Sequence, residues 1–226
     1  MSVNEKMTAI ADAVRIKTGS TQKLSLDGIA DGVEDVFEAG KKTGYDAFWD
    51  AFQDYGNRTD YQVAFSRGFP MEAYNPKYDL QGNVNSVFGM GKIIDAKVKI
   101  LNATDITQMG RYNSVLARIP ELNMMESTVI GSDNNPFLGA TKLSELIMTG
   151  VLAKSIIFSS CPLNADSVRS IISCMKDFSG TDKEYSFTIT FKSSSFSKLE
   201  AEDSTSPHGN TWAEYIDDLK WNLTLA

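Results

Sequence analysis

Three regularly spaced aspartates are the first feature of this 226-residue sequence that could do chemistry. Asp46, Asp50 and Asp54 repeat every four residues within "YDAFWDAFQDYGNRTDY", a spacing that would place three carboxylates on one face of a helix. Carboxylates so placed can bind a divalent cation. No histidine or glutamate stands beside them, however, and the same spacing is common on solvated helix faces. We therefore interpret this face as solvated and expect no metal site.

The usual nucleophiles and bases give no catalytic pattern either. His208 is the single histidine and lies in the loop sequence "SPHGN", which favours a surface position. Cys161 and Cys174 have neither a zinc-binding spacing nor the number needed for a disulfide framework, so we expect two small buried side chains. We predict no enzyme and no catalytic residue. Two glycosidase carboxylates can be distant in sequence, so a glycan-cleaving activity stays open as a weaker alternative.

One glycine-rich segment, "VFGMGKI", resembles a phosphate-binding loop only superficially. Ser86 stands where the first glycine is required, and Ile93 follows the lysine in place of serine or threonine. We expect no nucleotide and no other cofactor.

Composition narrows the possible partners. The formal net charge is −7, and lysines and arginines form no cluster, which argues against nucleic acid as a partner. No apolar run reaches the 18 residues of a membrane span, so we expect no membrane partner. The start "MSVNEKMTAIADAV" contains acidic residues and lacks the apolar core of a secretory signal. We expect the chain to stay in the cytoplasm where it is made, or to leave it within a larger assembly.

Residues 1–56 read as a helical arm. Ser2 and Glu5 form a capping box for a first helix, and a second helical pattern begins near Ser25. Glycines weaken this second helix, so it needs a partner. The partner is either the first helix, in an intrachain hairpin, or another copy of the chain, in a short coiled coil. The residues that would mediate self-association have heptad spacing: Leu26, Ile29, Val33 and Val36.

The end of the arm is rich in aromatic residues. Phe48 and Phe52 share one helix face, and Tyr45 and Trp49 lie beside it. Burial of each ring would contribute roughly 1.5–3 kcal/mol. We interpret these four residues as a rigid joint between the arm and the rest of the chain.

The remainder divides into a connector over residues 57–96, packed on the body, and a body over residues 97–226. In the body, short pieces alternate apolar and polar residues between turns, as strands do. We expect strands in residues 97–101, 117–124, 143–148, 154–158, 185–191 and 221–225, and helices in 164–178 and 211–219. The expected fold class is α+β, a helical arm followed by an irregular leucine-rich-repeat-like β-solenoid with interspersed helices.

Two N-terminal motifs carry a family resemblance. Residues 9–11 and 14–15 give "AIA" and "VR", and residues 23–30 give "KLSLDGIA". This segment resembles the N-terminus of tail and baseplate-associated proteins of phages and prophages of Gram-positive hosts. Residues 39–66 are similar to a subset of these proteins in which a leucine-rich body follows. The resemblance is strong only over residues 4–66.

The resemblance implies a non-enzymatic phage virion protein of the tail tip, baseplate or fibre. The arm would anchor to other tail or baseplate proteins, and the body would present a binding surface for host cell-surface polysaccharide or protein. It also implies assembly in the bacterial cytoplasm, residence in the virion, and a homo-oligomer, for which we favour a trimer. The alternative is a prophage-encoded leucine-rich-repeat adhesin or interaction module that does not enter the virion.

Overall fold

The computed structural model describes Thr8, Ala11, Asp12, Ile16, Pro76 and residues 79–89, 93–181 and 187–226. The chain divides into two compact units, Met1–Gly56 and Asn57–Ala226. In the first unit, Thr8, Ala11, Asp12 and Ile16 are helical. The remaining residues of that unit lie outside the described part, and with them the heptad and aromatic positions named above.

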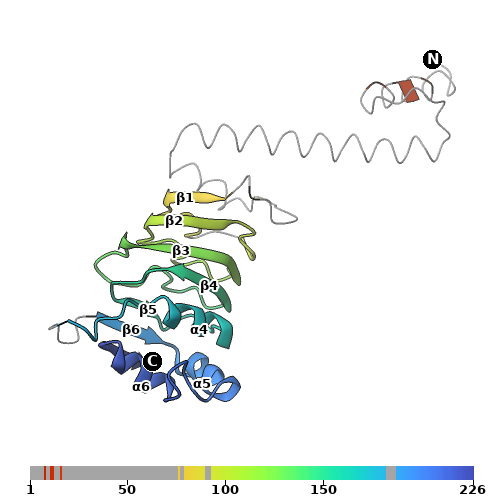
Figure 1. Ribbon diagram of the computed structural model, residues 1–226. Coiled ribbons are helices and arrows are strands. Elements are labelled where there is room, and N and C mark those ends of the chain that lie inside the picture. Colours follow the sequence, from red (N-terminus) through yellow and green to blue (C-terminus); the bar gives the residue numbers. More distant parts are fainter. Residues whose placement is uncertain are drawn as a thin grey trace. The chain divides into compact units, whose positions relative to one another are not determined.

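The described part of the second unit contains strands and helices, and within each sheet the strands lie side by side in chain order (Figure 1). A four-stranded sheet has the order β1-β2-β3-β4, and a three-stranded sheet has the order β5-β6-β7. The strands are β1 (Leu80–Asn83), β2 (Lys99–Asp105), β3 (Arg118–Val129), β4 (Glu145–Gly150), β5 (Ile156–Phe158), β6 (Phe187–Phe191) and β7 (Trp221–Leu225). The helices are α4 (Ala165–Ser173), α5 (Ser193–Glu202) and α6 (Trp212–Asp218).

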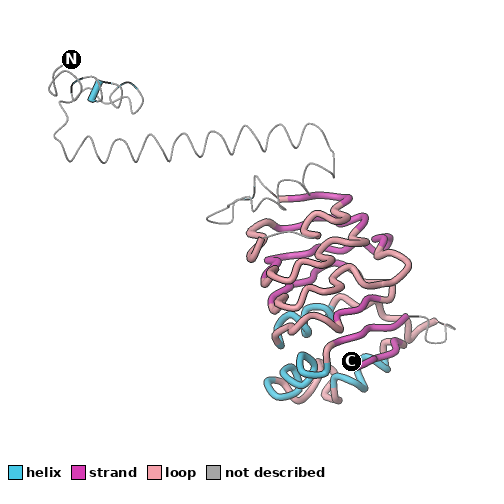
Figure 2. The backbone as a smooth tube through the Cα atoms, turned by 180° about the vertical axis from the view of Figure 1, so that it is seen from behind, coloured by secondary structure: helices cyan, strands magenta, loops and turns pink. Residues whose placement is uncertain are grey.

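Each adjacent pair of these strands is parallel. Parallel neighbours need a connection that returns the chain to the starting edge of the sheet. Here the returning segments run behind the strands, as the view from the back shows (Figure 2). The described part of the unit is therefore a mixed helix-and-strand structure with parallel sheets and three helices, which confirms the expected mixture of helices and strands at that level.

We call one strand, together with the segment that leads to the next strand, a layer. The layers stack because the same strand position is apolar and buried in each one. Strand register places Leu80 against Ile100, Ile100 against Leu122, and Leu122 against Met148, and all four side chains are buried. No layer could bury this column alone, so each depends on its neighbours.

A second column, of phenylalanines, connects the two sheets. The ring centroids of Phe137 and Phe158 are 5.6 Å apart, and those of Phe158 and Phe191 are 6.0 Å apart. Phe196 of α5 continues the column at 6.0 Å from Phe191. Offset ring pairs at such distances add to the stabilisation that burial alone provides.

Helix boundaries follow from caps and from strand pairing. The Asn164 side chain accepts a hydrogen bond from the Ser167 backbone at the start of α4. The sequence predicted this helix to continue to residue 178, but α4 ends at Ser173. The chain instead pairs with Leu152, which exchanges backbone hydrogen bonds with Cys174 and Lys176. The predicted helix over residues 211–219 is present as α6, which begins at a capping box formed by Thr211 and Glu214.

Candidate binding surface

The outward face of the four-stranded sheet gathers polar side chains from successive layers. Along β2 to β4, apolar residues point inward and alternate residues point toward solvent. Eight residues on the outward side form what we call the ladder surface. They are Asp95, Lys99, Asn102, Arg118, Glu121, Asn123, Glu145 and Thr149.

One row of the ladder surface is a run of alternating charge. Arg118 lies opposite Asp95 on one side and Glu145 on the other. Its Nη1 is 3.3 Å from Asp95 Oδ2, and its Nε is 3.0 Å from Glu145 Oε2. One guanidinium thereby joins three layers through its two ion pairs.

A second row combines an ion pair with amide and hydroxyl groups. Lys99 Nζ is 2.9 Å from Glu121 Oε2, and Thr149 Oγ1 donates to Glu121 Oε1 at 3.2 Å. Asn123 Nδ2 donates to Thr149 Oγ1 at 3.0 Å, while its Oδ1 accepts from the Asn102 backbone N–H at 3.2 Å. These hydrogen bonds fix the side chains relative to one another across β2, β3 and β4.

The carboxyl end of β3 borders this surface with a bulge. Register places Ala103 opposite Met124 and Asp105 opposite Val129, so β3 carries extra residues between those points. Buried Thr128 fills the gap, because its Oγ1 accepts from the Met125 N–H at 2.9 Å and donates to the Ala103 carbonyl at 2.6 Å.

Two lysines from later layers hold the tip of the bulge. Lys154 Nζ donates to the Ser127 carbonyl at 3.3 Å, and Lys176 pairs with Glu126. Met125, in the bulge, is exposed, and so is Val129 at the end of β3. Val151 is also exposed and follows Gly150, which pairs with Met124. The edge of the ladder surface is therefore fixed in place and partly apolar.

The ladder surface suits recognition better than it suits stabilisation. Its ion pairs are solvent-exposed, with the Arg118 side chain 46% exposed, and exposed pairs contribute roughly 0–1 kcal/mol each. What the arrangement supplies is a rigid array of donors and acceptors on regular strands. Such an array can form hydrogen bonds with a macromolecular ligand without first losing side-chain freedom.

The candidate chemical residues from the sequence do not come together. His208 is exposed in the loop before α6, its ring edge-on to Tyr215 with centroids 4.8 Å apart. Cys161 and Cys174 are buried, as predicted. Burial raises the pKa of the Cys161 thiol to about 12 and that of Cys174 to about 11. Both thiols are therefore protonated and unreactive at neutral pH.

Within residues 79–89, 93–181 and 187–226, no group of three or more His, Cys, Asp or Glu side chains could hold a metal ion. No helix in the described part of the chain is long and apolar enough to span a bilayer. The proposed oligomerisation residues (Leu26, Ile29, Val33 and Val36) and joint residues (Tyr45, Phe48, Trp49 and Phe52) lie outside the described residues. The three aspartates Asp46, Asp50 and Asp54 do so as well.

Sequence reasoning did not single out the members of the ladder surface. Their signal is present but weak: five of them (Lys99, Arg118, Glu121, Asn123 and Glu145) lie at polar strand positions next to a buried leucine or isoleucine. Only the register brings Asp95, Arg118 and Glu145 into line, and register depends on the lengths of the returning segments, which differ from layer to layer.

No protein-family model matches the chain, and no curated protein or solved structure matches it significantly.

Proposed function

We propose that the chain is a non-enzymatic structural protein of a phage virion, in the tail tip, baseplate or a fibre. In this proposal the N-terminal helices anchor the protein to the assembly, and the body presents the ladder surface. The motifs of residues 9–15 and 23–30 support the first part, through their resemblance to tail and baseplate-associated proteins. The polar array on the sheet supports the second.

We propose further that the body is an irregular leucine-rich solenoid. Three features support this interpretation: the strands are parallel and follow chain order, an apolar column recurs at one strand position, and the phenylalanine column continues from one sheet to the next. A solenoid suits a display role, because each layer adds surface without enlarging a single core. The irregular layer lengths leave room for local additions such as the bulge of β3.

The observation that carries the proposal is the ladder surface itself. Arg118 forms ion pairs with residues of the layers on both sides of it. Asn123 forms hydrogen bonds with Asn102 of β2 and with Thr149 of β4, so the outward groups are held at fixed separations. A fixed array of mixed charge and amide groups matches ligands that carry repeated polar groups, which describes both a surface polysaccharide and a polar protein surface. Several bodies on one virion would strengthen weak single contacts by roughly 10²–10⁴ when their spacing matches the target.

A cell-binding assay with paired variants tests the binding role. Fluorescently labelled full-length protein is incubated with cells of the strain that carries its gene. The double substitution Lys99→Ala with Arg118→Ala removes the two cations of the ladder surface. The matched control, Lys142→Ala with Lys198→Ala, removes two exposed cations elsewhere on the body and so changes the net charge equally.

We expect the ladder variant to lose about fivefold or more in apparent affinity, as a central interface residue commonly does, and the control to bind as the parent does. Circular dichroism melts confirm that both variants are folded. Equal binding by the two variants would contradict a role for the ladder surface. Release of soluble sugar fragments from the cells, abolished by substitution of an acidic residue, would contradict the non-enzymatic proposal.

A further inference from the structure

Tyr112 is a bulky residue in a backbone conformation that bulky residues avoid. Its φ is +60°, in the left-handed region. The other described non-glycine residues in this region are serine, lysine and asparagine, so Tyr112 is the one aromatic among them. A left-handed residue with a large side chain is an outlier, and its strain, roughly 1–3 kcal/mol, persists only where the surroundings impose it.

The next layer shows what residue this turn accepts without strain. Gly110 and Tyr112 donate backbone hydrogen bonds to Pro136 and Leu138, which aligns Tyr112 with Gly139. Gly139 is itself left-handed, with φ +79°, and a Cβ built on it would lie 3.5 Å from Tyr112 Cα. The same turn position thus holds glycine in one layer and tyrosine in the layer before it. The tyrosine side chain is not needed to make the turn.

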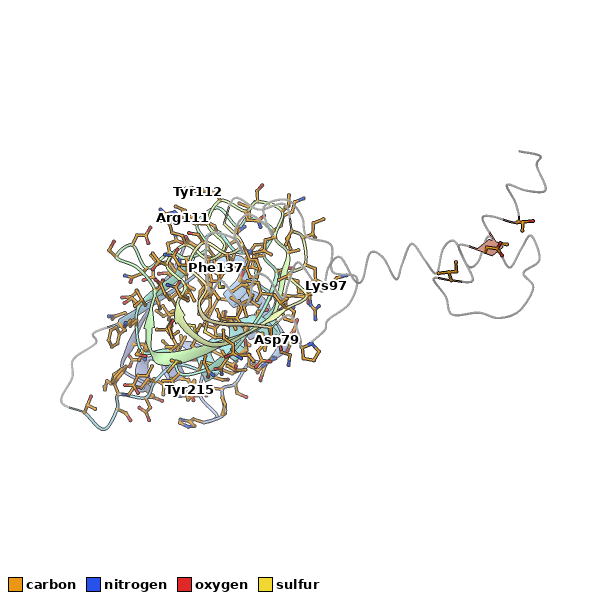
Figure 3. All side chains as sticks on the ribbon, turned by 90° about the horizontal axis from the view of Figure 1, so that it is seen from above. Asp79, Lys97, Arg111, Tyr112, Phe137 and Tyr215 are labelled. Atoms are coloured by element: carbon orange, nitrogen blue, oxygen red, sulfur yellow. The ribbon has the colours of Figure 1, made fainter. Side chains whose placement is uncertain are left out.

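The tyrosine ring is nevertheless held and displayed. The Arg111 guanidinium carbon is 5.3 Å from the ring centroid, and a Cβ on Gly139 would lie 3.4 Å from Tyr112 Cδ1, so the bare glycine backbone adjoins one edge of the ring. The residue is still 56% exposed. Figure 3 shows Arg111 and Tyr112 next to each other at one margin of the body, with Lys97 and Asp79 elsewhere.

Arg111 is fixed in turn by the following layer. Its Nη1 is 2.6 Å from Asp133 Oδ2, and its side chain is 21% exposed against 41% for Asp133. Interaction with Tyr112 first, and with Asp133 as well, raises the pKa of Arg111 above its ordinary value. A planar ring, a guanidinium and a carboxylate thus form one preorganised group across two layers.

The surroundings of this group are polar. Gln108, Ser132 and Asn134 are exposed or half-buried in the same two turns, and Asp133 Oδ1 accepts from the Asn135 N–H at 3.3 Å. The centre of a protein-protein contact is normally an apolar patch that excludes water around its aromatic residues. An isolated aromatic ring with a rim of charged and amide groups fits a ligand with one apolar face and many hydroxyl groups.

We propose that Arg111, Tyr112 and Asp133 form a carbohydrate-binding subsite on the turn side of the body, separate from the ladder surface. The C–H groups on one face of a pyranose carry partial positive charge and would pack on the electron-rich face of the Tyr112 ring. Vicinal hydroxyl groups would donate to the Asp133 carboxylate and accept from the Arg111 guanidinium, whose fork geometry suits paired oxygens. The subsite requires the folded body and does not depend on membership of a virion.

The test uses the full chain labelled with ¹³C in the tyrosine rings. Spectra are recorded while neutral methyl glycosides of glucose, galactose, rhamnose and N-acetylglucosamine are added up to about 100 mM, since a single sugar ring is expected to bind on the order of millimolar. We expect at least one glycoside to shift the Tyr112 ring signal saturably, with dissociation constants in that range, and to leave the signal of Tyr215 unchanged. If none of the four shifts the Tyr112 signal, the proposal is overturned.

The substitution Tyr112→Gly separates ligand binding from stability. Glycine relieves the left-handed strain, so the variant should melt at or above the parent temperature and should lose glycoside binding at least tenfold, read from a ¹⁵N spectrum of the Arg111 region. The matched control is Lys97→Gly, which relieves a left-handed residue (φ +49°) on another margin of the body and should leave binding intact. Retained binding in Tyr112→Gly would overturn the proposal. A Tyr112 shift that depends on protein concentration and not on sugar would overturn it in favour of a contact between copies of the chain.

Discussion

Single buried polar side chains decide how one layer is joined to the next. Asn113 is fully buried. Its Nδ2 donates to the Phe88 carbonyl of the preceding layer at 3.0 Å, and its Oδ1 accepts from the Val115 and Leu116 backbone N–H groups. One amide therefore satisfies backbone groups in two layers.

Asn113→Ala should therefore destabilise the body more than the loss of so few side-chain atoms would suggest. Backbone groups left buried without partners cost about 1–3 kcal/mol each, so we expect a loss of about 2–4 kcal/mol in the free energy of unfolding, measured by urea denaturation. The adjacent exposed residue provides the control: Ser114→Ala should change that free energy by less than about 0.5 kcal/mol. Equal stability of the two variants would show that the Asn113 amide is not a structural bond.

The cysteines make a prediction about pH. Both thiols have a pKa in the folded state, about 12 for Cys161 and about 11 for Cys174, that exceeds the unfolded value. Below about pH 8.5 both thiols are protonated in the folded and the unfolded state, so their titration does not change the stability with pH. Above it the unfolded state loses protons first, so stability falls as the pH rises toward the folded values.

Two measurements examine this. A disulfide reagent at pH 7.5 should modify neither thiol of the native protein within the time that it modifies both in urea. Replacing both cysteines by alanine should flatten part of the fall in melting temperature between pH 8.5 and 10.5. Rapid native labelling would mean that one thiol is accessible, against the burial described above.

At this scale the sequence predicted exposure and burial better than it predicted roles. An exposed His208 and two buried cysteines were expected from their neighbours in sequence. Asn113 and Tyr112 were not singled out, because "RYNS" reads as an ordinary turn. The partner of Asn113 is 25 residues away, and the strain at Tyr112 is visible only in its backbone angle.

At the scale of elements, local alternation was enough to locate most strands. β2 to β7 overlap the six segments predicted from the period-two pattern. β1 was not predicted, because "LQGN" is too short and too polar to stand out. It forms because it pairs with β2, with Leu80 opposite Ile100.

Helices were predicted where caps or apolar spacing were clear. α6 begins at its capping box, whereas α5 was missed, since "SSSFSKLEAE" opens with three serines and has no side-chain cap. α5 is stabilised by packing: Phe196 and Leu199 are buried, and Ser195 Oγ donates to the Cys161 carbonyl at 3.1 Å. Such long-range contacts cannot be read from the local pattern.

The approach of β4 to β3 gives an element-scale prediction. Gly150 ends β4 with φ +83°, and a Cβ there would lie 2.0 Å from the Met124 carbonyl oxygen of β3. Gly150→Ala should force the strands apart and cost about 3 kcal/mol or more. Gly209→Ala is the matched control, because Gly209 has φ +81° but nothing within 4 Å of its added Cβ.

We therefore expect Gly209→Ala to cost only the strain of a left-handed alanine, about 1–2 kcal/mol. The difference between the two variants, measured by denaturant unfolding, isolates the contact between the strands. If both lose the same stability, the close approach of Gly150 to Met124 is not as described.

At the scale of the whole molecule, the account depends on the arm. The sequence predicts that the heptad residues Leu26, Ile29, Val33 and Val36 lie on a glycine-weakened helix that would need a partner. We predict a trimer for the full chain and a monomer for a shortened chain that starts at Tyr61, both measured by light scattering at tens of micromolar. A full-length monomer would favour the intrachain hairpin instead.

The central claim is that this chain is a component of the virion. The most direct test is quantitative mass spectrometry of phage particles purified by density gradient from the strain that carries the gene, with the cleared lysate analysed in parallel. The account predicts peptides from both Met1–Gly56 and Asn57–Ala226 in the particles, at a constant ratio to the tail proteins across the gradient. Abundant peptides in the lysate with none co-sedimenting with the particles would contradict the claim and favour a free adhesin or interaction module.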